Sequence, residues 1–136
     1  MKKLIFLAAL VMVTTAGFSQ TATATAAPKA DVALAVFETQ NFDFGKIKQG
    51  VPATHEFTFT NKSKITMVIT NVQASCGCTT PDWTKQPIPP NGTGFVKATY
   101  NAAGVGAFDK SVTVMANVES GVIILRIHGE VAAPAN

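Results

Sequence analysis

The chain has 136 residues, of which 47% are hydrophobic and 14% charged, enough apolar content for one folded core. Eleven basic against eight acidic side chains give a formal net charge of +3. No stripe of lysine and arginine with interleaved aromatics accompanies this charge, which argues against a nucleic-acid partner. Two cysteines are too few for a disulfide-dense miniprotein, so packed apolar residues must supply most of the stability.

Residues 1–19 have the layout of a secretory signal peptide. Lys2 and Lys3 give a positive start, Leu4–Val13 is an unbroken apolar run, and small residues lead to a cleavage point before Gln20. The run falls well short of the roughly 20 residues that a membrane-spanning helix needs. We therefore expect export to the periplasm or the cell exterior, with no membrane span in the mature form. Removing two of the eleven basic residues leaves the mature chain nearly neutral.

The remaining chain divides into three parts. Residues 20–33 are small and polar without a usable period, and are expected to form a flexible tether. Residues 34–132 form the expected domain, and residues 133–136 a short tail. Within the domain, hydrophobic residues alternate with period two between turn residues, which indicates strands rather than helices. Strands are expected at Leu34–Glu38, Phe42–Ile47, Thr54–Thr60, Ile65–Val72, Phe95–Asn101, Lys110–Val118 and Val122–Val131.

Three of these segments carry more specific predictions. Thr54–Thr60 alternates cleanly between apolar and polar residues, so it is expected to be half-buried. Ile65–Val72 is rich in β-branched residues and is expected to lie centrally, covered on both faces. The proline-rich stretch after residue 75 excludes a central strand but allows a short edge strand at Thr79–Trp83. Core side chains of the last two strands are expected to be Val112, Val114, Ile123, Leu125 and Ile127.

The fold class follows from this spacing. About seven short antiparallel strands at regular intervals, with no amphipathic helix, indicate an all-β, immunoglobulin-like sandwich of two sheets.

Five segments of the sequence together form a recognisable pattern. They are Asp43-Phe44-Gly45-Lys46-Ile47, Phe57-Thr58-Phe59-Thr60-Asn61, Ile69-Thr70-Asn71-Val72, Ser75-Cys76-Gly77-Cys78-Thr79 and Ile127-His128-Gly129-Glu130-Val131. Over about 95 residues this pattern resembles domain-of-unknown-function family fifteen seventy-three. The resemblance implies export and an immunoglobulin-like fold, similar to the domains of pilus chaperones, major sperm protein and Hydin-type proteins. The family has no assigned activity, so the resemblance implies none here.

The sharpest chemical signal is Cys76-Gly77-Cys78, which has three interpretations. The sulfurs can bond to each other if the chain turns, which Gly77 would permit by adopting a positive φ. Such a small ring would be weakly stabilising and easily reduced, so it could exchange with other thiols. The cysteines can instead be small, half-buried residues that shape a loop.

The third interpretation is a metal site. Two thiolates one residue apart suit a soft ion such as Cu(I), and the strand order could bring His55 and His128 to the same end of the sandwich. Against it, both histidines are isolated on strands and lack paired-ligand spacing. No cofactor is expected on any other grounds.

The expected function is protein–protein interaction or a structural role in the cell envelope. The alternative is a Cu(I)-binding or thiol-redox protein that uses Cys76 and Cys78. The acidic side chains are scattered singly, and neither histidine accompanies a nucleophile motif, so an enzyme is not expected. Trp83, Ile88 and Pro89 could form an apolar patch for an unidentified protein partner, although a single tryptophan more often caps the end of a sandwich. The alternative surface is an uncovered edge strand that pairs with a partner.

Overall fold

The computed structural model describes residues 31–135, so the predicted signal peptide and most of the tether lie outside the described residues. Eight strands and no helix make up this part of the chain. No helix in residues 31–135 therefore has the length and hydropathy that a membrane crossing needs. The strands are β1 (Ala35–Phe37), β2 (Asn41–Lys48), β3 (Ala53–Asn61), β4 (Ile69–Ala74), β5 (Thr79–Trp83), β6 (Thr93–Tyr100), β7 (Gly106–Ala116) and β8 (Val122–Ala132).

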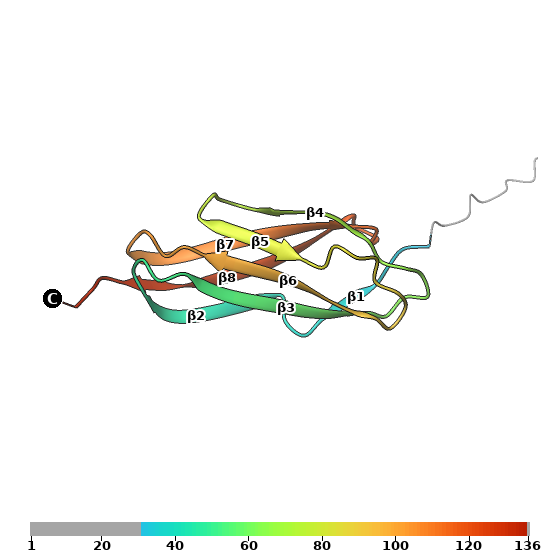
Figure 1. The fold of residues 1–136 in the computed structure, drawn as a ribbon, viewed down its shortest axis with the longest axis horizontal. Coiled ribbons are helices and arrows are strands. Elements are labelled where there is room, and N and C mark those ends of the chain that lie inside the picture. The colour runs from blue at the N-terminus through green and yellow to red at the C-terminus, as the bar shows by residue number, and fades with distance from the viewer. Residues whose placement is uncertain (1–30, 136) are drawn as a thin grey trace, which may run out of the picture.

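The strands form two four-stranded sheets, in the orders β1-β3-β6-β5 and β2-β8-β7-β4. The strands run along the long axis of the molecule, and the two sheets lie against each other across it (Figure 1). This confirms the predicted immunoglobulin-like sandwich, with one strand more than expected. All pairs are antiparallel except β2 with β8, which run parallel because the chain crosses from one sheet to the other between β1 and β2.

The core lies between the sheets, where the alternating apolar side chains of both meet. Phe57 of β3 and Val96 of β6 belong to one sheet, Val112 of β7 and Leu125 of β8 belong to the other, and all four are buried in one apolar cluster. Of the five predicted core residues in the last two strands, Ile123 is only partly buried. The period-two alternation that predicted the strands is thus the same feature that fills the core.

The strand predicted at Ile65–Val72 differs from the structure. Regular pairing begins only at Ile69, and β4 lies at the edge of its sheet, with β7 as its only strand neighbour. Met67 forms an isolated bridge with Ile88 instead, and both side chains are buried. Thr66, Val68 and Thr70 are exposed, so the stretch is covered on one face only, and the prediction of a central strand covered on both faces is wrong.

The N-terminal boundary of the folded part also differs by a residue. Ala33, which the sequence placed in the tether, is buried and forms a parallel bridge with Val118. Its backbone N–H donates to the carbonyl of Asn117 at 2.8 Å. The incoming chain is therefore attached to the β7–β8 hairpin before β1 begins.

Candidate functional site

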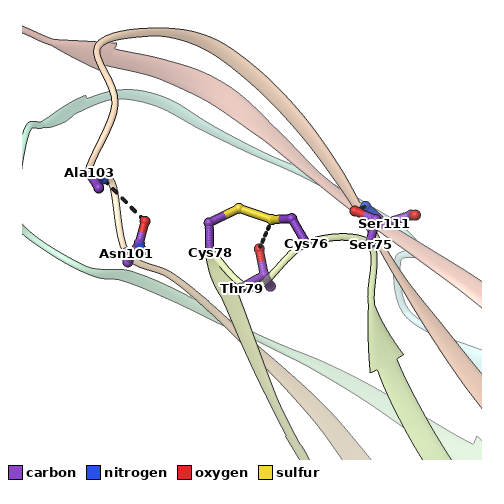
Figure 2. Close-up of a disulfide and its surroundings, with 7 residues drawn as sticks. All are labelled: Ser75, Cys76, Cys78, Thr79, Asn101, Ala103 and Ser111. Carbon is purple, nitrogen blue, oxygen red and sulfur yellow. Dashed lines mark hydrogen bonds between the residues drawn. A yellow bond between two sulfur atoms is a disulfide. The ribbon is translucent and has the colours of Figure 1, made fainter.

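The Cys76–Cys78 turn joins the edge strand of one sheet to the edge strand of the other, because β4 ends at Ala74 and β5 begins at Thr79. The two sulfurs are bonded to each other, and the cysteine Cα atoms lie 5.3 Å apart (Figure 2). Gly77 does not have the positive φ that the sequence analysis proposed for it. The chain reverses direction between the sheets without any left-handed residue in the turn.

Backbone hydrogen bonds hold this turn on both sides of the disulfide. Before it, the Ser75 N–H donates to the Ser111 carbonyl at 2.8 Å, and the Ser111 N–H donates to Ser75 Oγ at 3.1 Å. After it, the Asn101 N–H donates to the Cys78 carbonyl at 2.9 Å. Closing a ring of three residues removes only about 1–2 kcal/mol of unfolded-state entropy. The sandwich therefore depends little on this bond.

Thr79 lies directly against the disulfide. Its side chain is 4% exposed, and its hydroxyl lies 3.8 Å from Cys76 Sγ (Figure 2). Because a disulfide sulfur carries no hydrogen, the hydroxyl is the donor, and it donates to a weak acceptor. The cysteines themselves are half-buried, and Gly77 is exposed. One face of the turn thus meets a buried hydroxyl, and the other is open to solvent.

The four candidate metal ligands do not form a site. Cys76 and Cys78 are bonded to each other, so neither offers a thiolate. His55 lies on β3, two strands across the sheet from Pro81 of β5, a separation of roughly 10 Å. His128 pairs with Asp43 across the other sheet, Nε2 to Oδ2 at 3.7 Å. Residues 31–135 hold no group of three or more histidine, cysteine or acidic side chains arranged for a metal ion.

His55 is a packing residue. Its ring stacks on Phe42 at 3.6 Å between centroids, and meets the edge of Phe57 at 4.6 Å. Its Nε2 is buried without a hydrogen-bond partner among the described residues. Desolvation lowers the pKa of His55 below its usual 6.5, and the nearby Glu56 carboxylate opposes this shift.

A pH dependence of stability follows. With its pKa lowered on folding, His55 is neutral in both states above pH 6.5, and below that pH the unfolded chain takes up the proton first. We expect the melting temperature to fall as the pH drops from about 7 to 5. In a His55→Phe variant the melting temperature should fall less over the same range, because the titrating group is gone. The check is thermal unfolding by circular dichroism across that range, with His128→Phe as the control. Equal slopes in wild type and His55→Phe would contradict the assignment.

The predicted partner loop is largely unavailable. Ile88 is 2% exposed and sits in the core, so its place in a binding patch is a wrong prediction. Trp83 is half-buried against the core, and the Lys85 Nζ lies 2.9 Å from its ring centroid. Of the three residues, only Pro89 is exposed. This loop covers the end of the sandwich.

The free edge of β5 is closed to further pairing. In an antiparallel ladder every second residue directs its backbone groups away from the neighbouring strand. On β5 these residues are Thr79, Pro81 and Trp83. Pro81 has no N–H, the Thr79 N–H donates to the Cys76 carbonyl at 3.3 Å, and the Trp83 N–H donates to Asp82 Oδ1 at 2.9 Å. No donor of β5 remains for an added strand.

On two other edge strands, β4 and β2, a side chain of the same strand also occupies a backbone N–H group. On β4 the Val72 N–H donates to the side chain of Asn71 at 2.9 Å. On β2 the Gly45 N–H donates to Asp43 Oδ1 at 2.7 Å, within a bulge where Gly45 has a φ of 62°. The fourth edge, β1, has only three residues. The general prediction of an uncovered edge strand therefore fails for β5 and is weakened for β2 and β4.

One length of β8 remains open. Pairing between β2 and β8 starts at Asn41 and Arg126, so no strand of residues 31–135 flanks the first part of β8. The backbone groups of Val122 and Ile124 point away from β7, as does the Arg126 N–H, which bonds to the Gln40 carbonyl. The side chains of Val122 and Ile124 are also exposed, Ile124 by 53%. The outward backbone groups of Ile124 thus have no strand neighbour at the place where two apolar side chains are exposed.

An apolar groove of about 660 Å³ lies beside this length of β8, between the hairpin and the incoming chain. Sequence analysis missed both features, because the alternation of β8 does not reveal where β2 stops covering it. We call Val122–Leu125 with this groove the open β8 edge. The groove is lined by Val32, Ala33, Leu34, Ala35, Val118, Glu119, Ser120 and Ile123.

Solved structures share this fold at low sequence identity. A protein of unknown function from Porphyromonas gingivalis W83 is 13% identical with a TM-score of 0.67, the match covering 80% of this chain and 51% of that one. The ASH/PapD-like domain 7 of human CEP192 is 9% identical with a TM-score of 0.64, covering 98% and 100%. The secreted serine protease VesC of Vibrio cholerae is 14% identical with a TM-score of 0.59, covering 75% and 24%.

These likenesses show the fold alone. The chain spans about half of the Porphyromonas gingivalis protein and about a quarter of VesC. No curated protein matches the chain. The model of a family described as protein of unknown function (DUF1573) matches residues 35–131, from the first strand to the last. The chain therefore belongs to the DUF1573 family.

Proposed function

We propose that this protein is an exported, non-enzymatic interaction module that binds an extended segment of a partner protein along the open β8 edge. The observation that carries the proposal is that the outward backbone groups of Ile124 have no strand neighbour, and that the side chains of Val122 and Ile124 beside them are exposed and apolar. The other long edges carry internal hydrogen bonds, a bulge or a proline. A sheet that protects its other edges leaves this one for pairing.

The open edge specifies the chemistry of its occupant. The Ile124 N–H and carbonyl would pair with the backbone of an added strand, while the carbonyl of Val122 already accepts from Ser120 Oγ at 2.6 Å. Alternate side chains of that strand would point into the groove, where Leu34 and Ile123 form apolar walls. The partner segment should therefore be extended, with apolar residues at alternate positions.

Export rests on the signal-peptide layout of residues 1–19. The expected mature protein begins at Gln20, which mass spectrometry of the protein from the cell envelope tests directly. A mature chain that still contains Met1 or Lys2 would remove the exported context, and would leave the binding surface to be tested separately.

Substitution of Ile124 tests the binding proposal. A photo-crosslinking amino acid at position 124 should capture one partner from the envelope fraction. The purified partner should then bind the wild type but not Ile124→Lys, because the lysine places a charge on the apolar edge. Binding is measured by isothermal titration, and hydrogen exchange should show the Ile124 amide protected in the complex.

Val105→Lys is the matched control, since Val105 is 56% exposed and lies in the loop before β7, beside the far end of β8 from Val122 and Ile124. It should bind like the wild type. Equal loss in both variants, or an Ile124 amide that exchanges as fast with partner as without, would refute strand addition. Self-association of the purified chain that is abolished by Ile124→Lys would instead identify a second copy as the occupant and refute a separate partner.

A further inference from the structure

We propose that the Cys76–Cys78 disulfide is a thiol–disulfide exchange site in which an incoming thiolate attacks Cys78 Sγ and Cys76 leaves, stabilised by Thr79. The inference goes beyond the proposed function and does not depend on the open β8 edge. Three observations carry it: the access to the sulfurs, the independence of the turn from the bond, and the position of the Thr79 hydroxyl.

Access comes from the exposed side of the turn. Both cysteines are half-buried and Gly77 between them is exposed. A Cβ atom placed on Gly77 would meet no heavy atom beyond the two neighbouring cysteines within 4 Å. The turn is therefore open beside Gly77. Cys78 packs against the core on one side, but both cysteines keep part of their surface exposed to an external thiolate.

The turn does not need the disulfide to keep its shape. The bonds from Ser75 to Ser111, from Asn101 to Cys78 and from Thr79 to Cys76 join backbone groups on both sides of it. Cleaving the sulfur–sulfur bond breaks none of them. The oxidised and reduced forms can therefore share one fold, and the bond can open and close without unfolding.

The Thr79 hydroxyl makes the two sulfurs unequal. It is buried and donates to Cys76 Sγ, which in a disulfide is a weak acceptor. A thiolate on Cys76 would be a much stronger acceptor for the same hydroxyl. The pKa of a leaving thiol controls how readily it leaves, so this hydrogen bond selects Cys76 as the leaving group.

The exchange balances as two displacements. The incoming thiolate forms a bond to Cys78 Sγ as the Cys78–Cys76 bond breaks, and the bond's electron pair stays on Cys76 as a thiolate. A second thiol of the same class then displaces Cys78, which gives two protein thiols and the oxidised form of the reductant. The reductant is any low-molecular-weight or protein thiol, and the reverse sequence oxidises a dithiol substrate.

Glutathione is the probe, and the rate of reduction of the full mature protein is the measurement. Thr79→Val removes the hydroxyl at nearly constant volume and should slow reduction about tenfold, since the leaving group loses its stabilising donor. Thr79→Ser keeps the hydroxyl and should retain the wild-type rate within about a factor of two. Thr80→Val makes the same change at the exposed neighbour and should also leave the rate unchanged.

Two further measurements separate this role from a structural one. Acid-quenched intermediates should carry glutathione on Cys78, and the Cys76 thiol of Cys78→Ser should have a lower pKa than it has in Cys78→Ser with Thr79→Val. Equal reduction rates for Thr79→Val and Thr80→Val would overturn the proposal. So would glutathione found on Cys76, reduction only in denaturant, or loss of the β-sheet circular dichroism signal on reduction.

Discussion

Replacing Asn61 with alanine is expected to lower the free energy of unfolding by about 3 kcal/mol. The side chain is completely buried, and every polar atom in it is used. Its Nδ2 donates to the carbonyls of Ile65 and Ile88 at 2.8 and 3.0 Å, and its Oδ1 accepts from the N–H and hydroxyl of Ser63 at 3.1 and 2.6 Å. Alanine removes all four bonds and leaves a cavity.

The measurement is urea unfolding followed by circular dichroism, with Asn41→Ala as the control because Asn41 is exposed. Asn41→Ala should change the free energy of unfolding by less than about 0.5 kcal/mol. The same loss in both variants, or a loss below about 1 kcal/mol in Asn61→Ala, would contradict a central role for the Asn61 hydrogen bonds.

Asn61 has this importance because of where it lies. It ends β3, and its amide reaches both the irregular stretch after β3 and the segment around Ile88. That stretch is the part of the domain where the predicted strand was wrong. Here the Asn61 side chain satisfies backbone carbonyls that a neighbouring strand would satisfy elsewhere. A segment outside the regular strands can therefore be buried.

Much of the fold could be predicted because strand patterning is local. Phe57 and Phe59 alternate with polar residues along β3, so both the strand and its buried face follow from period two alone. The order of strands in a sheet is a non-local property. Ile69 and Val72 have the composition of a central strand, yet β4 is an edge, and nothing within that segment distinguishes the two cases.

The candidate sites were predictable to different degrees. The one-residue spacing of Cys76 and Cys78 indicated that a disulfide would require a turn, and the structure has both. The burial of Thr79 against Cys76 depends on the approach of the two sheets, so it has no signature in the sequence. The hydrogen bonds that occupy the Val72 and Trp83 N–H groups do have a signature in the sequence, because an Asn or Asp directly precedes each of these edge-strand residues.

The same edge protection connects the fold to both proposals. On β4 and β5, side chains of the same strand occupy outward N–H groups, so that side of the sandwich is poorly suited to strand pairing. The turn that joins these two strands carries the Cys76–Cys78 disulfide instead. The opposite side keeps the open β8 edge, because β2 pairs with β8 only from Arg126 onward and does not cover Val122 and Ile124. The two proposed activities therefore occupy separate surfaces and can be removed one at a time.

The parallel β2–β8 pair depends on close approach at Gly129. A Cβ atom at this position would lie 2.8 Å from the Gly45 carbonyl oxygen and 3.0 Å from the Phe108 ring. The Gly45 carbonyl belongs to the backbone of the bulge in β2, and Phe108 is buried, so neither can move without disturbing its neighbours. Glycine is required here for space, not for an unusual φ.

Gly129→Ala is therefore expected to destabilise the domain by about 2 kcal/mol, because the added methyl must push β2 away from β8 or displace Phe108. Hydrogen exchange should show faster exchange at the β2 amides that bond to β8, while the β3–β6 ladder of the other sheet keeps its protection. Gly104→Ala is the control, since its added Cβ would meet nothing within 4 Å. If Gly129→Ala unfolds at the same urea concentration as Gly104→Ala, the two strands are held less closely at this point than the structure indicates, and β2 is free to adjust.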